Sequence, residues 1–266
     1  MSIAAATRMG AVHLSVADLT RSLGFYDSAL GLRVHARDGD GAVLGTGGED
    51  LLVLTERPGA APADGYAGLF HFALRVPERL DLARWLTYAA QDHLPLTGLS
   101  DHYVSEAIYL RDPDHHGIEI YWDRPRSLWE GEVAQRLTTE PLDVQDLVRD
   151  VDRPAGLPSG TVMGHVHLRV ASIPETNSFY RDVLGFDVMA SMGRQATFLS
   201  AGGYHDHLGA NTWESANRPR APETTARLER VTILLPSPEE LEWVAERAGA
   251  TDLRDPSGNP VALELA

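Results

Sequence analysis

The chain of 266 residues contains no cysteine. This absence excludes disulfide bonds, thiolate nucleophiles and zinc sites built on cysteine, so any bound metal must be held by His, Asp and Glu. Long apolar runs are also missing, since no segment approaches the ~20 apolar residues that cross a bilayer and residues 1–10 lack the apolar stretch of a secretion signal. We therefore expect a cytoplasmic protein with no membrane partner.

Basic residues are scarce relative to acidic ones. The sequence has 23 Lys and Arg against 38 Asp and Glu, which gives a net charge of −15. Such a charge repels phosphate backbones, so nucleic acid is not expected as a partner. With 43% hydrophobic residues, a chain of this length can form one large domain or two ordinary ones.

An internal repeat organises the chain. The segment GAVHLSVADLTRSLGFYDSALGLRV, from Gly10, aligns without gaps with GHVHLRVASIPETNSFYRDVLGFDV, from Gly164. Each copy begins with an alternating strand pattern and continues into apolar residues at helical spacing. Gly31 and Gly185 fit the left-handed position just past a helix end. Three short strand candidates follow the first helix, LRVHAR, GAVLGT and DLLVLTE, so the repeat predicts a βαβββ module.

Two further modules are more diverged. The second begins at LFHFALRV, has a helix from about Leu80 to Gln91 and ends in the hairpin AIYLRDPDHHGIEIYWD; the fourth begins at RVTILLP, has a helix near Glu239 to Arg247 and is shortened. We predict an α+β fold of four βαβββ modules. Modules 1 and 2 are expected to form an N-terminal domain at residues 9–124, and modules 3 and 4 a C-terminal domain at 161–266, separated by a connector at 125–160.

The motifs resemble a known superfamily. Paired βαβββ modules with FYxxxLG helices, DPDxxGIE hairpins and His in the first strand are similar to the vicinal-oxygen-chelate superfamily of glyoxalases, bleomycin-resistance proteins and extradiol dioxygenases. The runs HYVSEAIYLRDPDHHGIEIYWDRP, GHVHLRV and SAGGYHDHLGANTW resemble its catechol-2,3-dioxygenase group. The resemblance implies cups made by two modules, with metal ligands on the first and last strands. It also implies an enzyme that opens a catechol-type aromatic diol with dioxygen, using Fe(II), with Mn(II) or Zn(II) as alternatives.

The metal ligands implied by the resemblance depend on which modules share a cup. If modules 2 and 3 do, the ligands are His71, Glu119 and His167; if modules 1 and 2 do, they are His13, His71 and Glu119. Two His and one carboxylate on one face of Fe(II) leave positions open for a bidentate diol and dioxygen. We favour the first set. His165 has the same strand parity as His167, but His167 aligns with His13 and is preferred.

A second histidine pair lies at the end of module 3. His205 and His207 have equal parity and are both expected to face the cup, whereas Asp206, where the family run commonly carries a third His, is expected on the opposite face. A histidine beside the metal can exchange protons with the diol near neutral pH. We predict this role for His207, with His205 as the alternative. Three further residues are predicted to contact the substrate: His102, Tyr121 and Asn211.

Two other functions are compatible with the same superfamily. A glyoxalase- or epimerase-like isomerase or lyase would use a divalent metal with a fourth protein ligand, often Glu or Gln. A drug-sequestering protein of this fold would need no metal, and the paired imidazoles and embedded carboxylate argue against it. Because four modules can complete their cups within one chain, a monomer or homodimer is expected.

Overall fold

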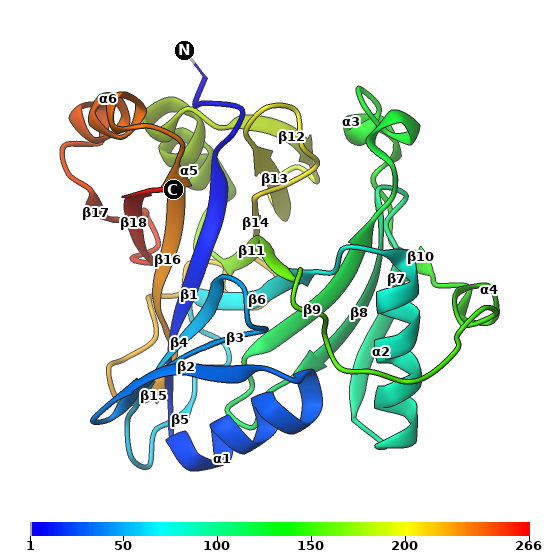
Figure 1. Ribbon diagram of the computed structural model, residues 1–266. Helices are drawn as coiled ribbons and strands as arrows, with labels where there is room; N and C mark the ends of the chain where they lie inside the picture. Colours follow the sequence, from blue (N-terminus) through cyan, green and yellow to red (C-terminus); the bar gives the residue numbers. More distant parts are fainter. Residues whose placement is uncertain (1) are drawn as a thin grey trace.

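Two curled β-sheets with short helices around them form the molecule, as Figure 1 shows for the computed structural model, which describes residues 2–266. The seven-stranded first sheet has the order β17-β18-β16-β1-β4-β3-β2, and the nine-stranded second sheet has the order β10-β7-β8-β9-β6-β11-β14-β13-β12. The α+β fold predicted from the sequence is therefore confirmed.

The first sheet contains β1 (Arg8–Val16), β2 (Arg33–Asp38), β3 (Gly41–Gly45), β4 (Asp50–Glu56), β16 (Leu228–Leu235), β17 (Asp252–Arg254) and β18 (Pro260–Leu265). The second contains β6 (Gly68–Arg75), β7 (Leu96–Asp101), β8 (Ser105–Arg111), β9 (Gly117–Asp123), β10 (Glu140–Pro141), β11 (Val162–Arg169), β12 (Asp187–Ser191), β13 (Ala196–Ser200) and β14 (Leu208–Asn211). Two short strands, β5 (Ala61–Pro62) and β15 (Thr225–Ala226), pair separately. The helices are α1 (Leu19–Phe25), α2 (Arg79–Gln91), α3 (Val133–Arg136), α4 (Val144–Leu147), α5 (Ile173–Asn177) and α6 (Pro238–Ala248), with a 3-10 turn at Arg126–Leu128 and π-helical turns at Tyr26–Leu30 and Ser178–Leu184.

Each sheet joins modules from both parts of the chain. Antiparallel pairing of β1 with β16 brings modules 1 and 4 together, and pairing of β6 with β11 brings modules 2 and 3 together. Modules 1 and 2 lie in different sheets, so His13 is not in the sheet that contains His71. Each sheet therefore combines strands from before and after the connector at 125–160, that is, from both of the expected domains at 9–124 and 161–266.

The repeated helices end as their glycines predict. Gly31 and Gly185 follow the π-helical turns in the left-handed conformation, with φ of 76° and 95°. The Asp18 side chain caps α1 by accepting a hydrogen bond from the Arg21 backbone N–H, which satisfies one of the free donors at a helix start. Glycine tolerates the left-handed conformation at no steric cost, which is why each helix stops there.

One buried apolar cluster spans both sheets. It includes Val12 and Leu14 from β1 and Phe72 and Leu74 from β6, each with no exposed surface. Because these side chains come from both sheets, the two sheets share one core. Burying each of them stabilises the fold by about 1.5–3 kcal/mol. Within residues 2–266, no helix has the length and apolar character needed to span a bilayer.

The connector at 125–160 packs across the second sheet. Trp129 and Val133 form a buried cluster with Val104, which precedes β8, and with Ala190 of β12. Because β8 and β12 lie toward opposite ends of the strand order, this cluster ties the two ends of the curled sheet together (Figure 1).

A buried carboxylate fixes the turn that leads into β9. The Oδ1 atom of Asp112 accepts hydrogen bonds from the backbone N–H groups of Asp114 and His116, at 2.9 and 2.8 Å. Its Oδ2 atom accepts from the Tyr26 hydroxyl at 2.9 Å. The FYxxxLG and DPDxxG motifs thus contact each other across modules 1 and 2, and together they set where β9 begins.

Gly164 is the extra residue of a β-bulge in β11, and its repeat partner Gly10 lies at a bulge in β1. A Cβ at Gly164 would lie 1.9 Å from the Tyr121 hydroxyl, whereas one at Gly10 would lie 3.0 Å from Thr232 Cγ2. We therefore expect Gly164→Ala to lower the free energy of unfolding by roughly 1–3 kcal/mol and Gly10→Ala to lower it less. Urea unfolding of both variants tests this, and equal losses would contradict it.

Candidate metal centre

Three buried side chains converge on one face of the second sheet: His71 on β6, Glu119 on β9 and His165 on β11. The Glu119 Oε2 atom lies 3.0 Å from His71 Nε2 and 3.1 Å from His165 Nε2, and the two Nε2 atoms are 3.4 Å apart. The strand register explains this grouping, because Ala73 pairs with Glu119 on one side and with His165 on the other. The small Ala73 side chain lets the two larger ones meet.

The spacing of these donor atoms fits a bound metal ion. Ligand atoms ~2.1 Å from a metal and at right angles to each other lie ~3 Å apart, which matches the separations of 3.0, 3.1 and 3.4 Å. Two imidazole nitrogens and one carboxylate suit Fe(II), Mn(II) and Zn(II). Within residues 2–266, no other group of three His, Asp or Glu side chains brings its donor atoms within 4.8 Å of one another.

Two of the three side chains are already in the protonation state that a metal requires. Burial alone would raise the pKa of Glu119, but the charges and hydrogen bonds of His165 and His71 hold this pKa well below its usual range. Burial lowers the pKa of His71. Burial would also lower the pKa of His165, but the carboxylates of Asp206 and Glu119 raise it above its usual value.

A fourth ligand from the equivalent strand of module 3 is sterically excluded. In module 2, Glu119 pairs with Ala73, which is two residues after His71. In module 3, Gly209 of β14 pairs in the same way with His167, which is two residues after His165. Gly209 therefore takes the position that Glu119 has in module 2. A Cβ there would lie 2.6 Å from His167 Nδ1, so the His167 ring fills the space of the missing side chain. Three protein ligands leave the other coordination positions open.

The predicted ligand set and the observed cluster differ in one member. The structure brings His71 and Glu119 together, but the third residue is His165, while His167 packs against His71 with ring centroids 5.0 Å apart. Burial lowers the pKa of His167 far enough to keep it neutral, and its Nε2 atom has no hydrogen-bond partner. The segments HFALRV and HVHLRV align His71 with His165, and this signal outweighs the alignment with His13.

The corresponding positions of the first sheet hold an ion pair. His13 lies opposite Arg230, whose guanidinium donates to His13 Nε2 at 3.2 Å and pairs with Glu264 at 3.0 Å. Burial and the Arg230 charge lower the pKa of His13 to about 4. Ala262 takes the position of Glu119, since it pairs with the residue two positions after Arg230. This cup therefore lacks the converging carboxylate and imidazoles of the second sheet.

His205 lies between two carboxylates beside the cluster. Its Nε2 atom is 2.7 Å from Asp123 Oδ1, and its Nδ1 atom donates to Asp206. Burial alone would lower the pKa of His205, but the Asp206 charge and both hydrogen bonds raise it to about 9. Asp206 Oδ2 lies 3.9 Å from His165 Nε2, so Asp206 faces the cluster, whereas the sequence placed it on the opposite face.

His207 points away from the cluster. Its Nδ1 atom accepts a hydrogen bond from the Ala201 backbone N–H at 3.2 Å and lies 3.0 Å from Ser200 Oγ. Burial lowers the pKa of His207 to about 4. The ring lines a cavity between the sheets together with Arg8 and Met9 of β1. The two histidines of the predicted pair therefore have different surroundings, His205 beside the cluster and His207 in the lining of the cavity.

The His205 imidazolium makes stability depend on pH. Because its pKa rises from 6.5 to about 9 on folding, it contributes stability that is fully present below pH ~6.5 and is lost between pH ~6.5 and ~9, on the order of 3 kcal/mol. We expect His205→Gln to flatten this loss. Urea unfolding of the metal-loaded protein from pH 6 to 9.5 measures it, with His93→Asn at an exposed position as control. An unchanged pH slope in His205→Gln would refute the assignment.

Tyr109 and His102 form a hydrogen-bonded pair on the other side of the cluster. Tyr109 of β8 pairs with Glu119, and its ring centroid lies 5.5 Å from that of His71. His102 Nδ1 donates to the Thr138 carbonyl at 2.7 Å, so its Nε2 atom accepts from the Tyr109 hydroxyl at 2.6 Å. Burial and the Glu119 charge raise the pKa of Tyr109 well above its usual range. His102, a predicted substrate contact, therefore lies behind Tyr109.

The other two predicted contacts, Tyr121 and Asn211, are both buried and differ in their hydrogen-bond partners. The Tyr121 hydroxyl is buried and hydrogen-bonds the Tyr204 hydroxyl at 2.8 Å, next to Gly164. Asn211 lies two residues after Gly209 on the same face of β14, and its Nδ2 atom is buried without a partner. Asn211 is therefore the one of the two with a free donor.

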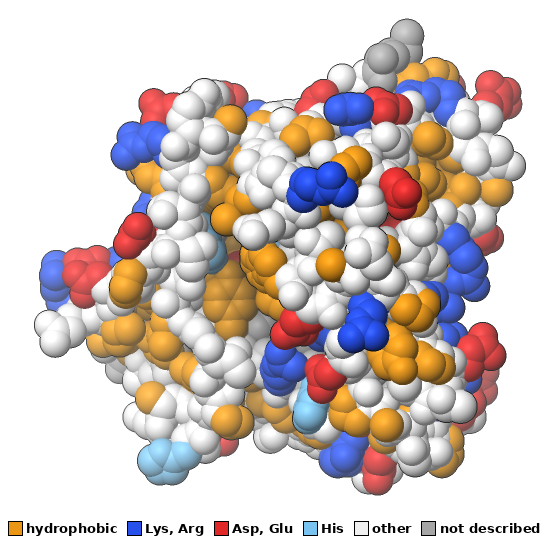
Figure 2. Space-filling view, turned by 180° about the vertical axis from the view of Figure 1, so that it is seen from behind, with side chains coloured by type: hydrophobic (Ala, Val, Ile, Leu, Met, Phe, Trp, Pro, Cys, Tyr) orange, Lys and Arg blue, Asp and Glu red, His pale blue; other side chains and the backbone are white. Residues whose placement is uncertain are grey.

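Aromatic rings surround His167 at one end of the cluster. The ring centroids of Phe70, Phe198 and Trp213 lie 5.2, 5.8 and 6.0 Å from that of His167. Phe70 is the extra residue of a β-bulge in β6, which redirects its side chain. Figure 2 shows the molecule hollowed, with hydrophobic side chains on the walls and histidine visible inside. Such walls suit a planar aromatic ligand.

Paired βαβββ modules around a buried His, His and Glu cluster define a vicinal-oxygen-chelate fold. The chain belongs to the Glyoxalase/Bleomycin resistance protein/Dioxygenase superfamily, whose family model matches residues 8–120. It is 40% identical over 249 residues to the catechol-2,3-dioxygenase of Bacillus subtilis (strain 168), covering 91% of this chain and 87% of that protein.

Solved structures share the fold. A candidate dioxygenase of Bacillus subtilis subsp. subtilis str. 168 superposes with a TM-score of 0.68 at 14% identity, covering 99% of this chain and 86% of that one. Glyoxalase I from Zea mays gives 0.56 at 18% identity, covering 97% and 92%. The cppA protein of Streptococcus pneumoniae TIGR4 gives 0.56 at 14% identity, covering 100% and 99%. At these identities the likeness extends to the fold alone.

Proposed function

We propose that the chain is an extradiol ring-cleaving dioxygenase that acts on a catechol-type aromatic diol with Fe(II). The observation that carries this proposal is the open cluster of His71, Glu119 and His165, with Gly209 where a fourth ligand would stand. The 40% identity to a catechol-2,3-dioxygenase supports the same reaction. A bound Fe(II) would supply a centre that holds the diol and dioxygen side by side and conducts electron density from one to the other.

The surrounding side chains would bind and orient the diol. The aromatic rings of Phe70, Phe198 and Trp213 would stack around the substrate ring. We propose that Tyr109 accepts the proton of one diol hydroxyl while donating its own to His102, whose Nε2 atom is free to take it.

Asp206 and His167 would hold the second diol hydroxyl and the dioxygen. Asp206, fixed by the His205 imidazolium, would accept a hydrogen bond from the diol. The Nε2 atom of the neutral His167 ring has no hydrogen-bond partner in the protein. It would form a hydrogen bond with an oxygen atom of the diol or of dioxygen. His207 takes no part in this scheme. Because both modules of the cup come from one chain, we propose that the site is complete in a monomer and is retained in a homodimer.

A glyoxalase-type isomerisation is the second candidate, and one observation favours it. The Asp206 carboxylate lies close enough to His165, at 3.9 Å, to serve as a base beside the metal. Isomerisation moves a proton within the substrate and consumes no oxygen, so oxygen uptake separates the two candidates.

The test is oxygen uptake by protein purified without air and analysed for metal. We expect nearly one iron per chain and, with a panel of substituted catechols, oxygen consumption that matches the yellow absorbance of a ring-opened product. No oxygen uptake after reconstitution with Fe(II) would reject the dioxygenase. Turnover of a hemithioacetal in the absence of oxygen would favour the isomerase.

A further inference from the structure

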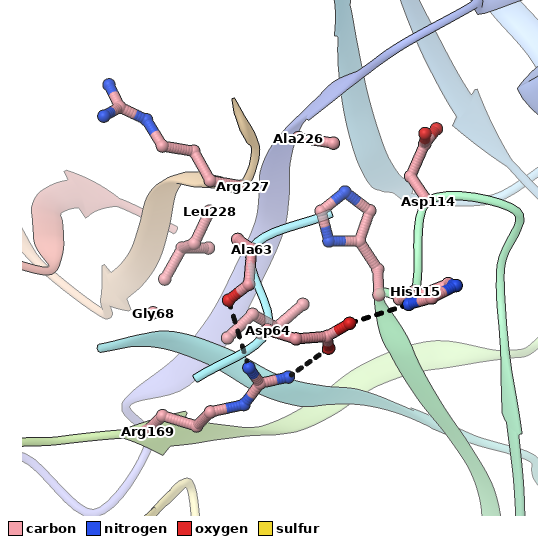
Figure 3. A pocket seen from close by; sticks show the side chains of 11 residues that line it. Ala63, Asp64, Gly68, Asp114, His115, Arg169, Ala226, Arg227 and Leu228 are labelled. Carbon is pink, nitrogen blue, oxygen red and sulfur yellow. Dashed lines mark hydrogen bonds and ion pairs between the residues drawn. The ribbon is translucent and has the colours of Figure 1, made fainter. Parts of the chain in front are cut away.

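A ligand-sized cavity lies between the two sheets, away from the metal cluster. Its volume is about 270 Å³, and it is bounded by Arg8 and Met9 of β1, Val162 and Met163 of β11, and the loop before β14. The pocket drawn in Figure 3, where Arg169 reaches Asp64 and the Ala63 carbonyl, has only about 10 Å³. That space holds about one water molecule, whereas 270 Å³ approaches the size of small-molecule sites.

The wall of the larger cavity carries excess positive charge. Arg8, Arg75 and Arg126 line it, with Glu49 as the acidic residue among its lining. Arg8 pairs with Glu49 at 2.8 Å. The acidic partners of the other two arginines, Asp123 for Arg75 and Glu130 for Arg126, lie outside the lining, while Arg126 also donates to the Gly202 carbonyl in the lining at 2.6 Å. In a chain with a net charge of −15, such a cluster of guanidinium groups favours an anion.

His207 adds a hydrogen-bond donor to the wall of the cavity. Because the Ala201 N–H can only donate, His207 Nδ1 is the acceptor, and the proton of this neutral ring lies on Nε2. His207 is 8% exposed and lines the cavity, and within residues 2–266 the two hydrogen-bond partners of its ring, Ala201 and Ser200, are both at Nδ1. Its Nε2–H can therefore donate to a ligand in the cavity.

The remaining wall is apolar. Met9, Val162 and Met163 contribute hydrocarbon and thioether surface, and the Tyr204 ring closes one side. We propose that this cavity binds a small carboxylate with an apolar body, its carboxylate at His207, Arg75 and Arg126 and its body against the methionines. The inference does not depend on the proposed reaction, although ring opening of a diol would form carboxylates of this class.

A hydrogen-bonded chain connects this site with the metal cluster. The Tyr204 hydroxyl donates to Asp123 Oδ2 at 2.9 Å, Asp123 Oδ1 lies 2.7 Å from His205, and His205 donates to Asp206. Asp206 in turn faces His165. A carboxylate bound beside Arg75 and Tyr204 would therefore contact the residues that hold His205 in place.

The test is isothermal titration of the metal-loaded, full-length protein with sorbate, a six-carbon carboxylate that lacks a diol. We expect one site per chain, binding weakened roughly tenfold in both Arg126→Gln and His207→Gln, and no binding of the neutral amide. Arg181→Gln, at an exposed residue outside the cavity lining, is the matched control and should bind like wild type.

Three results would overturn the proposal. Absence of sorbate binding up to 10 mM would do so, and so would equal affinity for the amide. Sorbate binding that survives Arg126→Gln and His207→Gln but disappears in His71→Ala would place the ligand on the metal. Circular dichroism checks that the variants are folded. The experiment measures binding and not turnover. A failure to bind sorbate would therefore leave the dioxygenase proposal intact, and a failure to consume oxygen would leave the carboxylate site intact.

Discussion

Replacing His165 by alanine is expected to remove the bound metal, whereas replacing His167 is expected to leave it in place. His165 Nε2 converges with His71 and Glu119, while His167 lies against the ring of His71 over Gly209. Loss of one of three ligands also leaves a buried carboxylate with one fewer imidazole partner. We expect His165→Ala and His71→Ala to lower metal affinity by more than ~100-fold, because even residues that only support a ligand change it 10- to 100-fold.

Metal analysis after gel filtration measures this difference directly. His13→Ala is the matched control, since His13 occupies the corresponding strand of the first sheet and bonds Arg230, and its metal content should equal that of wild type. Retention of metal by His165→Ala together with its loss in His167→Ala would show that the ligand set is His71, Glu119 and His167.

Tyr109→Phe is expected to lower kcat by roughly 10²- to 10⁴-fold, the usual range for a general acid or base, while the metal content stays unchanged. The substitution keeps the ring beside His71 and removes the hydroxyl that donates to His102. Since the diol would still bind the metal and the aromatic walls, the KM for the diol should change little.

Steady-state kinetics of the purified variant tests this prediction. Tyr88→Phe on α2 is the control, because its hydroxyl bonds the Ser28 carbonyl at the molecular surface. Activity of Tyr109→Phe within twofold of wild type would exclude Tyr109 from proton transfer, and a parallel loss in Tyr88→Phe would point to a general loss of stability.

Local features of the fold followed from the sequence. The periodicity and the glycines placed α2, α6 and the ends of both repeated helices within a few residues. The pairing of modules did not follow, because the contacts between β6 and β11 and between β1 and β16 join residues far apart in the chain. The pairing of modules 2 and 3 and that of modules 1 and 2 both offered a complete ligand triad, and the preference for modules 2 and 3 rested on the histidines at the end of module 3 and on the family resemblance.

Strand parity failed at the end of module 3 for a physical reason. Parity predicts that alternate residues share a face only within a regular strand, but β14 begins at Leu208. His205, Asp206 and His207 precede it in a loop, where backbone turns decide each direction. Asp206 therefore faces the cluster and His207 the space between the sheets.

The structure groups His165, and not the predicted His167, with His71 and Glu119, because the prediction took module 1 as its reference repeat. Module 1 carries His13 but no metal cluster, since Arg230 and Ala262 occupy the matching positions. A residue aligned with His13 therefore carries no ligand signal. The alignment of His71 with His165 is the relevant one, because β6 and β11 are related by a pseudo-twofold axis within one sheet. That relation between the two strands became evident only once the sheet pairing was known.

Turnover of a catechol under ¹⁸O₂, with mass analysis of the product, tests the proposed reaction most directly. Ring opening beside the diol inserts oxygen from dioxygen into the new carboxylate, so we expect a ring-opened product whose carboxylate carries one ¹⁸O atom. A product without label, formed at the same rate when oxygen is absent, would contradict the dioxygenase and leave a metal-dependent isomerase on the same site.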